Sequence, residues 1–311
     1  MIARSIETVF VMLTMMGVGW WMSRIGWLNE GAKKFINKYI VNVAVPALTL
    51  TNFLQMFPKD MIGQTVRFVG VAMGSMAIMM LLSEMIGRMI RIERLKSGSF
   101  STLSSLSNSM FFGMPIALSL FGEVALPYIL FYYMANSIMF WGVCAPRIMK
   151  DGKVKIRRIS ENLKKVLNAP FVAILVAMVL LALDWTLPSV VMETAGYLGR
   201  PVTPLAAIFI GRIIYEIDFK QYVFERSMAV VLILKFAVSP GIMLIITRFL
   251  GFDVLSTQVF VMMAAMPSVV QTTLVSELYG VDAKYTAFVI SLATILGLLF
   301  IPVYMYALSF L

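Results

Sequence analysis

The chain alternates long apolar runs with short polar segments. Because an α-helix rises about 1.5 Å per residue, roughly 20 apolar residues are needed to cross the hydrocarbon core of a bilayer. The runs have about this length. The pattern predicts ten transmembrane helices, at about residues 6–26, 33–54, 65–89, 101–121, 123–147, 166–184, 190–213, 225–248, 256–278 and 282–308.

The composition agrees with an all-α polytopic membrane protein. Of 311 residues, 60% are hydrophobic and 14% are charged, and the mean hydropathy is +0.89. A soluble domain could not cover so much apolar surface. The single cysteine, Cys144, excludes an internal disulfide framework, and the absence of histidine removes the usual zinc ligand and general base. We therefore expect no metal, no cofactor and no catalytic residues.

The net charge is +10, and the basic residues that produce it are unevenly distributed between the two sides of the predicted membrane protein. With ten spans, 20 of the 26 lysines and arginines fall in loops on one side of the membrane and four on the other, while Arg200 and Lys235 lie inside spans. Basic loops stay in the cytoplasm, so we expect a multi-pass protein of the bacterial inner membrane with both termini outside. The run Lys150–Lys165 then contacts anionic lipid headgroups and is not a nucleic-acid site.

The basic segment 150–165 separates two halves, 1–149 and 166–311, with five predicted spans each. Because five is odd, the second half enters the membrane from the opposite side, as in an inverted repeat. Weak similarity supports this relation, since YIVNVAVPAL aligns with YLGRPVTPLA, GMP with AMP and LFG with LYG. These matches fall in spans two and seven and in spans four and nine.

Two spans in corresponding positions contain helix-breaking residues. Gly113 and Pro115 lie near the middle of span four, and Pro267 lies near the middle of span nine. Unwound backbone at membrane depth is tolerated only inside protein or beside water. Two broken helices would present N-terminal ends, with their partial positive charge, to an anion. Ordinary proline kinks are the alternative.

Polar residues near these breaks are candidate substrate ligands. Asn108 precedes Pro115 by two turns, Asn136 lies in span five, and Gln271 and Thr272 follow Pro267. Amides donate two hydrogen bonds, so they can hold a carboxylate without a buried cation. Hydrogen bonding between helices is their alternative role.

Lys235 is the one cation predicted deep inside a span. An ionisable group at membrane depth is a functional candidate by default. Lys235 could neutralise a substrate carboxylate, replace a coupling cation or change protonation. A structural tie to carbonyl groups exposed at a break is the alternative.

The run from Asn108 through Ser109, Phe111 and Gly113 to Pro115, with the five-plus-five layout, resembles the auxin efflux carrier family. Its bacterial branch includes malonate and malate permeases, and it is related to the PIN-type auxin carriers. Similarity continues through the C-terminal segment from Ala265 to Tyr304 and covers nearly the whole chain.

The resemblance implies the fold of sodium/proton antiporters and bile-acid symporters, in which broken helices four and nine cross. Spans 3–5 and 8–10 would form a mobile transport bundle, and spans 1, 2, 6 and 7 a scaffold and homodimer contact. An organic anion would bind at the crossing and move by an elevator-type shift. The resemblance assigns Asn108, Asn136, Pro115 and Pro267 to that site.

Differences from the plant members of the family narrow the range of expected substrates. Ser109 stands where the plant carriers have threonine, and their long central loop is replaced by a short basic stretch. Small carboxylates of the malate or malonate type are therefore expected rather than auxin. Coupling to a proton, to sodium or to no ion stays open. A cation-coupled carrier like the bile-acid symporters and a non-transporting membrane sensor are the remaining alternatives.

Overall fold

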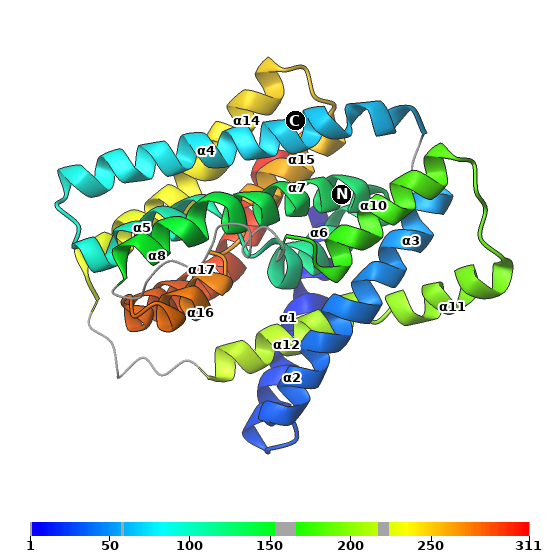
Figure 1. Cartoon of the computed structure of the whole chain (residues 1–311). Helices are drawn as coiled ribbons and strands as arrows, with labels where there is room; N and C mark the ends of the chain where they lie inside the picture. Colours follow the sequence, from blue (N-terminus) through cyan, green and yellow to red (C-terminus); the bar gives the residue numbers. More distant parts are fainter. Residues whose placement is uncertain (1, 57–58, 153–165, 217–223, 311) are drawn as a thin grey trace. The chain divides into compact units, whose positions relative to one another are not determined.

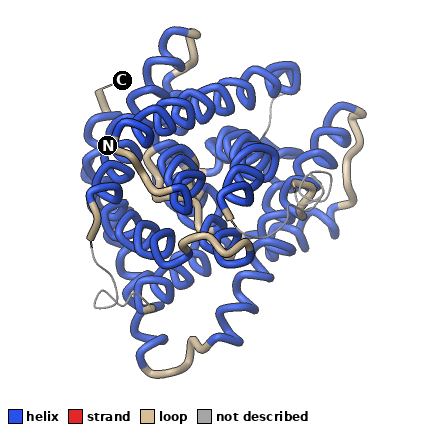
Figure 2. The backbone as a smooth tube through the Cα atoms, turned by 60° about the vertical axis from the view of Figure 1, so that its left-hand side comes forward, coloured by secondary structure: helices blue, strands red, loops and turns tan. Residues whose placement is uncertain are grey.

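A computed structural model describes residues 2–56, 59–152, 166–216 and 224–310. Every regular element in these ranges is a helix, and the same ranges contain no strand (Figures 1 and 2). An isolated antiparallel bridge joins Ser107 and Ser268. The prediction of an all-helical chain is confirmed for these residues. Most of the expected basic loop, residues 153–165, lies outside them.

Four described helical segments are long and apolar enough to cross a membrane, judged by length and composition. They are Ile62–Met89, Glu123–Asp151, Arg226–Phe249 and Ala283–Leu308. Shorter apolar helices cover Ser109–Phe121, Ala169–Ala182 and Val254–Ala264. The chain is therefore a membrane protein, while its ten-span layout stays a prediction.

Contacts divide the chain into two compact units that each draw on both halves of the sequence. Unit 1 contains residues 1–68, 110–131 and 167–216, and unit 2 contains residues 69–109, 132–166 and 217–311. The two contiguous repeats expected from the sequence are a separate prediction, which this division does not test.

Unit 1 is built from seven labelled helices, with the first residues of two more. These helices are α1 (Ile2–Arg24), α2 (Glu30–Tyr39), α3 (Val45–Met56), α6 (Met114–Phe121), α10 (Ala169–Ala182), α11 (Ser189–Gly199) and α12 (Val202–Tyr215). Helix α3 packs on α10 and α11, and α1 lies along α12 (Figure 1).

The contact between α1 and α12 depends on glycine. A methyl group built at Gly19 would overlap the carbonyl oxygen of Ile208, and one built at Gly211 would overlap the carbonyl oxygen of Met16. Close backbone approach at small residues is a common basis of helix association in membranes, where lipid removes the hydrophobic driving force. These two glycines therefore set the distance between the two helices.

Unit 2 surrounds a helix that is buried along most of its length. Its helices are α4 (Thr65–Met89), α5 (Arg94–Ser105), α7 (Leu126–Met139), α8 (Ala145–Asp151), α13 (Arg226–Ile233), α14 (Ser239–Phe249), α15 (Val254–Ala264), α16 (Gln271–Leu278) and α17 (Ala283–Leu308), with the starts of α4 and α7 in unit 1. Helix α5 is buried from Gly98 to Ser105 and contacts α8, α13, α16 and α17.

Small hydroxyl residues allow this burial of α5. Ser104 and Ser105 donate their hydroxyl hydrogens to carbonyl groups one turn earlier, at 2.8 and 2.7 Å, so neither buried hydroxyl is left unpaired. Gly98 donates its N–H to Asp151 of α8 at 2.5 Å. A polar but internally satisfied α5 can thus sit at the centre of unit 2.

Prolines widen several helices instead of breaking them. Four π-helical turns occur in the described ranges, and each ends two residues before a proline: Pro46, Pro115, Pro146 and Pro240. Proline lacks an N–H and its ring clashes with the carbonyl one turn earlier. At Pro46, Pro146 and Pro240 the preceding residue donates to the carbonyl five positions back, which gives the ring the extra room.

We expect Gly19→Ala to lower the stability of the protein, because the added methyl group must push α1 away from α12. Overpacking of this kind costs about 1–3 kcal/mol. Gly17, two residues earlier on α1, has open space around it, so Gly17→Ala is the matched control. Thermal unfolding of the two purified variants in one detergent measures the difference. Equal melting temperatures would contradict the packing role of Gly19.

Candidate functional site

Two helical segments are interrupted inside unit 2. The first interruption, Leu106–Asn108, follows α5, and the second, Ala265–Val270, separates α15 from α16 and contains Pro267. The predicted break at Pro267 is present. The predicted opening at Gly113 and Pro115 is wrong, because the chain is already helical there.

The conformation around Pro115 explains this correction. Gly113 has helical dihedral angles, φ −65° and ψ −51°, and Pro115 is the second residue of α6. Proline fits the first turn of a helix, where an N–H would have no intrahelical partner. The sequence therefore predicted the break a few residues too late in the chain: the interruption ends at Asn108, and Gly113 and Pro115 follow it in helical conformation.

The two interruptions are hydrogen-bonded to each other. The N–H of Asn108 donates to the carbonyl oxygen of Pro267 at 2.7 Å, beside the antiparallel bridge between Ser107 and Ser268. The Ser268 hydroxyl donates to the carbonyl oxygen of Leu103 at 2.7 Å. We call the segments Leu106–Asn108 and Ala265–Val270 the bridged break.

Asn136 of α7 fixes the backbone of the bridged break. Its Oδ1 accepts the N–H of Ser107, and its Nδ2 donates to the carbonyl oxygen of Ser107, both at 3.1 Å. The side-chain amide thus satisfies both backbone groups of one unwound residue. Asn136 is buried, and this pairing makes it a positioning residue for the break.

Lys235, from the second half of the sequence, also contacts Ser107. It lies in the π-helical turn Leu234–Val238, is 0% exposed, and donates from Nζ to Ser107 Oγ at 2.7 Å. Among the described residues, no carboxylate forms an ion pair with Lys235. The ammonium is therefore held by a neutral hydroxyl in the interior of unit 2.

Ser107 Oγ is the centre of this polar cluster. It lies 3.3 Å from the Tyr132 hydroxyl and donates to the carbonyl oxygen of Ala264 at 3.4 Å. Ala264 is the last residue of α15, and helix C-terminal ends carry partial negative charge. The cation of Lys235 is thus placed, through Ser107, beside helix ends that favour it.

The first turn of α16 brings hydrogen-bond donors to the break. Gln271 begins α16 and is half-buried, and Thr272 is fully buried. Within the described part of the chain, the Thr272 hydroxyl has no hydrogen-bond partner. A buried unpaired hydroxyl is costly unless something binds it, so Thr272 is a candidate ligand for a bound molecule.

The side chain of Asn108 is buried as well. Unit 2 thus brings together Asn108, Asn136, Lys235 and Pro267, with Gln271 at the start of the helix that follows the break. Gly113 and Pro115 belong to unit 1, and their part in the site stays a prediction.

Sequence reasoning missed Ser107, Tyr132 and Ser268. Ser107 acts through both its backbone and its hydroxyl group, and its hydrogen-bond partners Lys235 and Ala264 lie 128 and 157 residues away in the sequence, so local spacing gave no signal. Tyr132 lies one helical turn before Asn136, a relation that could have indicated it. Pro240, five residues after Lys235, likewise marks the widened turn that carries the lysine.

The cluster contains polar groups suited to hydrogen bonding and to charge neutralisation. In the described ranges, no three His, Cys, Asp or Glu side chains come together as metal ligands would. A lysine, a buried hydroxyl and a helix N-terminus are groups that bind carboxylates in proteins.

Comparisons with known proteins agree with a transport role. Residues 4–305 match the family described as membrane transport protein. An uncharacterized transporter of Methanocaldococcus jannaschii is 24% identical over 304 residues, which cover 96% of this chain and 97% of that protein. An uncharacterized transporter of Methanothermobacter thermautotrophicus is 24% identical over 305 residues, with the same coverage. The chain therefore belongs to the membrane transport protein family, the family of the auxin efflux carriers, and is a transporter and not an enzyme.

Proposed function

We propose that this protein is a secondary transporter of small organic anions and that the bridged break forms part of its substrate site. The observation that carries the proposal is the buried side chain of Lys235, whose Nζ contacts Ser107 where two unwound segments are hydrogen-bonded to each other. Unwound backbone at membrane depth is characteristic of transporter sites, where it lines a cavity.

The charge of Lys235 favours an anionic substrate. A buried cation without a carboxylate partner is costly in a low-dielectric interior. A carboxylate that binds beside Ser107 would supply the missing negative charge. The unpaired hydroxyl of Thr272 and the N-terminal end of α16 would donate hydrogen bonds to the same group, and Asn108 supplies a side-chain amide within the break itself.

The finer architecture is part of this proposal. Ten spans in two inverted five-helix repeats would carry the breaks in spans four and nine. Spans 3–5 and 8–10 would act as the transport bundle, and spans 1, 2, 6 and 7 as the scaffold and homodimer contact, in an elevator-type cycle. Unit 2 contains most of the proposed bundle, and unit 1 contains the proposed scaffold together with residues 110–131 of the bundle. The mixing of both sequence halves in each compact unit supports this assignment.

Small carboxylates of the malate or malonate type are the proposed substrates, ahead of auxin-like acids. A proton or sodium is the candidate coupling ion. The basic loops would face the cytoplasm of a bacterial cell and place both termini outside.

We expect Asn108→Ala to abolish accumulation of malonate or malate in proteoliposomes, because the site loses an amide next to the Pro267 contact. Asn42→Ala is the matched control, since Asn42 is exposed and its amide donates to the carbonyl oxygen of Lys38, one turn earlier. Saturable uptake and counterflow of labelled substrate provide the measurement.

Unchanged transport by a folded Asn108→Ala protein would remove Asn108 from the site. Wild-type protein that conducts either anion without saturation would replace the carrier by a channel. Failure of both acids to bind or move would overturn the proposed substrate class.

We expect Lys235→Met to impair carboxylate binding or to change the pH dependence of transport, because the variant removes the buried positive charge while retaining an apolar side chain of similar length. Lys284→Met is the control, since Lys284 is an exposed lysine at the start of α17. Substrate-induced thermal stabilisation and uptake between about pH 5 and 8 are measured. Normal transport by Lys235→Met at every pH would make the lysine structural.

A further inference from the structure

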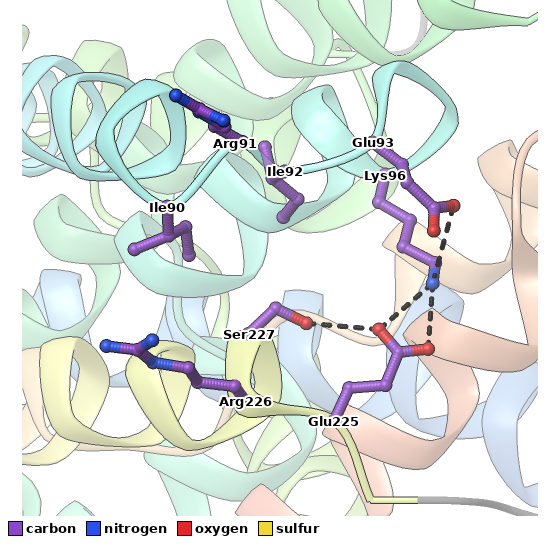
Figure 3. A pocket seen from close by; sticks show the side chains of 8 residues that line it. All are labelled: Ile90, Arg91, Ile92, Glu93, Lys96, Glu225, Arg226 and Ser227. Carbon is purple, nitrogen blue, oxygen red and sulfur yellow. Dashed lines mark hydrogen bonds and ion pairs between the residues drawn. The ribbon is translucent and has the colours of Figure 1, made fainter.

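The helical segment that carries Lys235 is bonded to α5 at its start. This segment, Arg226–Phe249, comprises α13, the π-helical turn and α14. Its N-cap residue, Glu225, accepts a hydrogen bond from Lys96 at 2.7 Å, and the Ser227 hydroxyl donates to the same carboxylate at 3.3 Å (Figure 3). Lys235 follows these contacts by more than two helical turns. They fix the start of the segment, and the turn around Lys235 needs contacts of its own.

Pro240 leaves one carbonyl group of this turn without its usual helical partner. In an α-helix each carbonyl oxygen accepts the N–H of the residue four positions later. For Phe236 that residue is Pro240, which has no N–H. Phe236 is buried, and a carbonyl group inside a membrane protein is costly to leave without a donor. The residue that follows Lys235 therefore requires a donor from another element.

Tyr304 of α17 supplies this donor. Its hydroxyl group donates a hydrogen bond to the carbonyl oxygen of Phe236. Phe300, one turn earlier on α17, stacks on the ring of Phe236, with the ring centroids 5.0 Å apart and the planes inclined by 16°. Two side chains of α17 thus contact both the backbone and the side chain of Phe236.

The position of the Lys235 side chain depends on the conformation of this turn. Lys235 and Phe236 share a peptide bond, so a rotation of the backbone at Phe236 also moves the Cα atom of Lys235. The Nζ atom lies 2.7 Å from Ser107 Oγ, and a hydrogen bond weakens when this distance grows by a few tenths of an ångström. Lys235 is 0% exposed, and close packing leaves a buried side chain little room to readjust.

We propose that Tyr304 is a positioning residue for Lys235. By donating to the carbonyl group that Pro240 cannot serve, Tyr304 holds the widened turn in the conformation that keeps Lys235 Nζ against Ser107. The inference rests on the proposed function, since it gives Tyr304 a part in the same anion site. Tyr304 acts through the backbone of the turn, so it is distinct from the residues proposed to bind the substrate.

Two measurements on Tyr304→Phe in one detergent test this role. Hydrogen–deuterium exchange of the backbone amides of the turn reports its conformation without any substrate. Calorimetric titration with malonate and with malate reports the site. Phenylalanine keeps the ring and removes only the hydroxyl group. Tyr306→Phe is the matched control, because it makes the same change two residues later on α17, at a side chain that is 57% exposed. Lys235→Met shows the full effect of losing the lysine.

We expect Tyr304→Phe to accelerate amide exchange in the turn and to weaken carboxylate binding by about tenfold each, the loss implied by one buried hydrogen bond. Tyr306→Phe changes neither quantity. Unchanged exchange in the turn overturns the positioning role. Unchanged affinity also overturns it if Lys235→Met binds weakly. A wild type that binds neither acid contradicts the proposed function instead, and the exchange result still decides whether Tyr304 holds the turn.

Pro240→Ala provides a test by rescue, since alanine restores an N–H that can donate to the carbonyl oxygen of Phe236. In the Pro240→Ala background we expect Tyr304→Phe to have a much smaller effect on exchange and on affinity than it has in the wild type. The reason is that the carbonyl group then has a backbone donor. Equal losses in the two backgrounds would mean that Tyr304 does not act through this carbonyl group, and would overturn the assignment.

Discussion

The structure depends on one constraint, that backbone N–H and carbonyl groups inside a membrane protein need partners. An unwound segment at membrane depth cannot rely on bulk water for them. The bridged break meets this demand with side chains and with a second unwound segment: Asn136 pairs both backbone groups of Ser107, and Pro267 accepts from Asn108. Several polar groups of this region are thus used to satisfy the irregular backbone. A ligand would bind to the remaining polar groups.

Several of these polar groups meet at one hydroxyl group. Ser107 receives the Lys235 ammonium, contacts Tyr132 and donates to the end of α15. A change in charge at Lys235 would therefore act directly on the backbone of the break. Because Ser107 connects the cation to both interrupted segments, substrate charge and helix geometry are coupled through one hydroxyl group.

The long apolar runs predicted the helical class and the approximate positions of the four described segments that are long and apolar enough to cross a membrane, since lipid demands long apolar helices. The interruption at Pro267 was predictable because Pro267 lies within an otherwise continuous apolar run. The one before Asn108 was placed at Gly113 and Pro115, where the chain instead absorbs the proline ring by widening a turn. Ser107 could not be predicted, because its backbone and its hydroxyl group acquire their roles only when the fold brings Asn136 and the distant Lys235 to them.

The widened turns have a consequence for helix phase. A π-helical turn accommodates one residue more than an α-helical turn, and each residue of an α-helix advances the chain by about 100°. The turn Leu234–Val238 therefore rotates every side chain of α14 relative to α13 by roughly that angle. Loss of a single residue there would leave a continuous helix but would present a different face of it to α15. Pro240, which requires the widened turn, thus sets the angular register of α14 relative to α13.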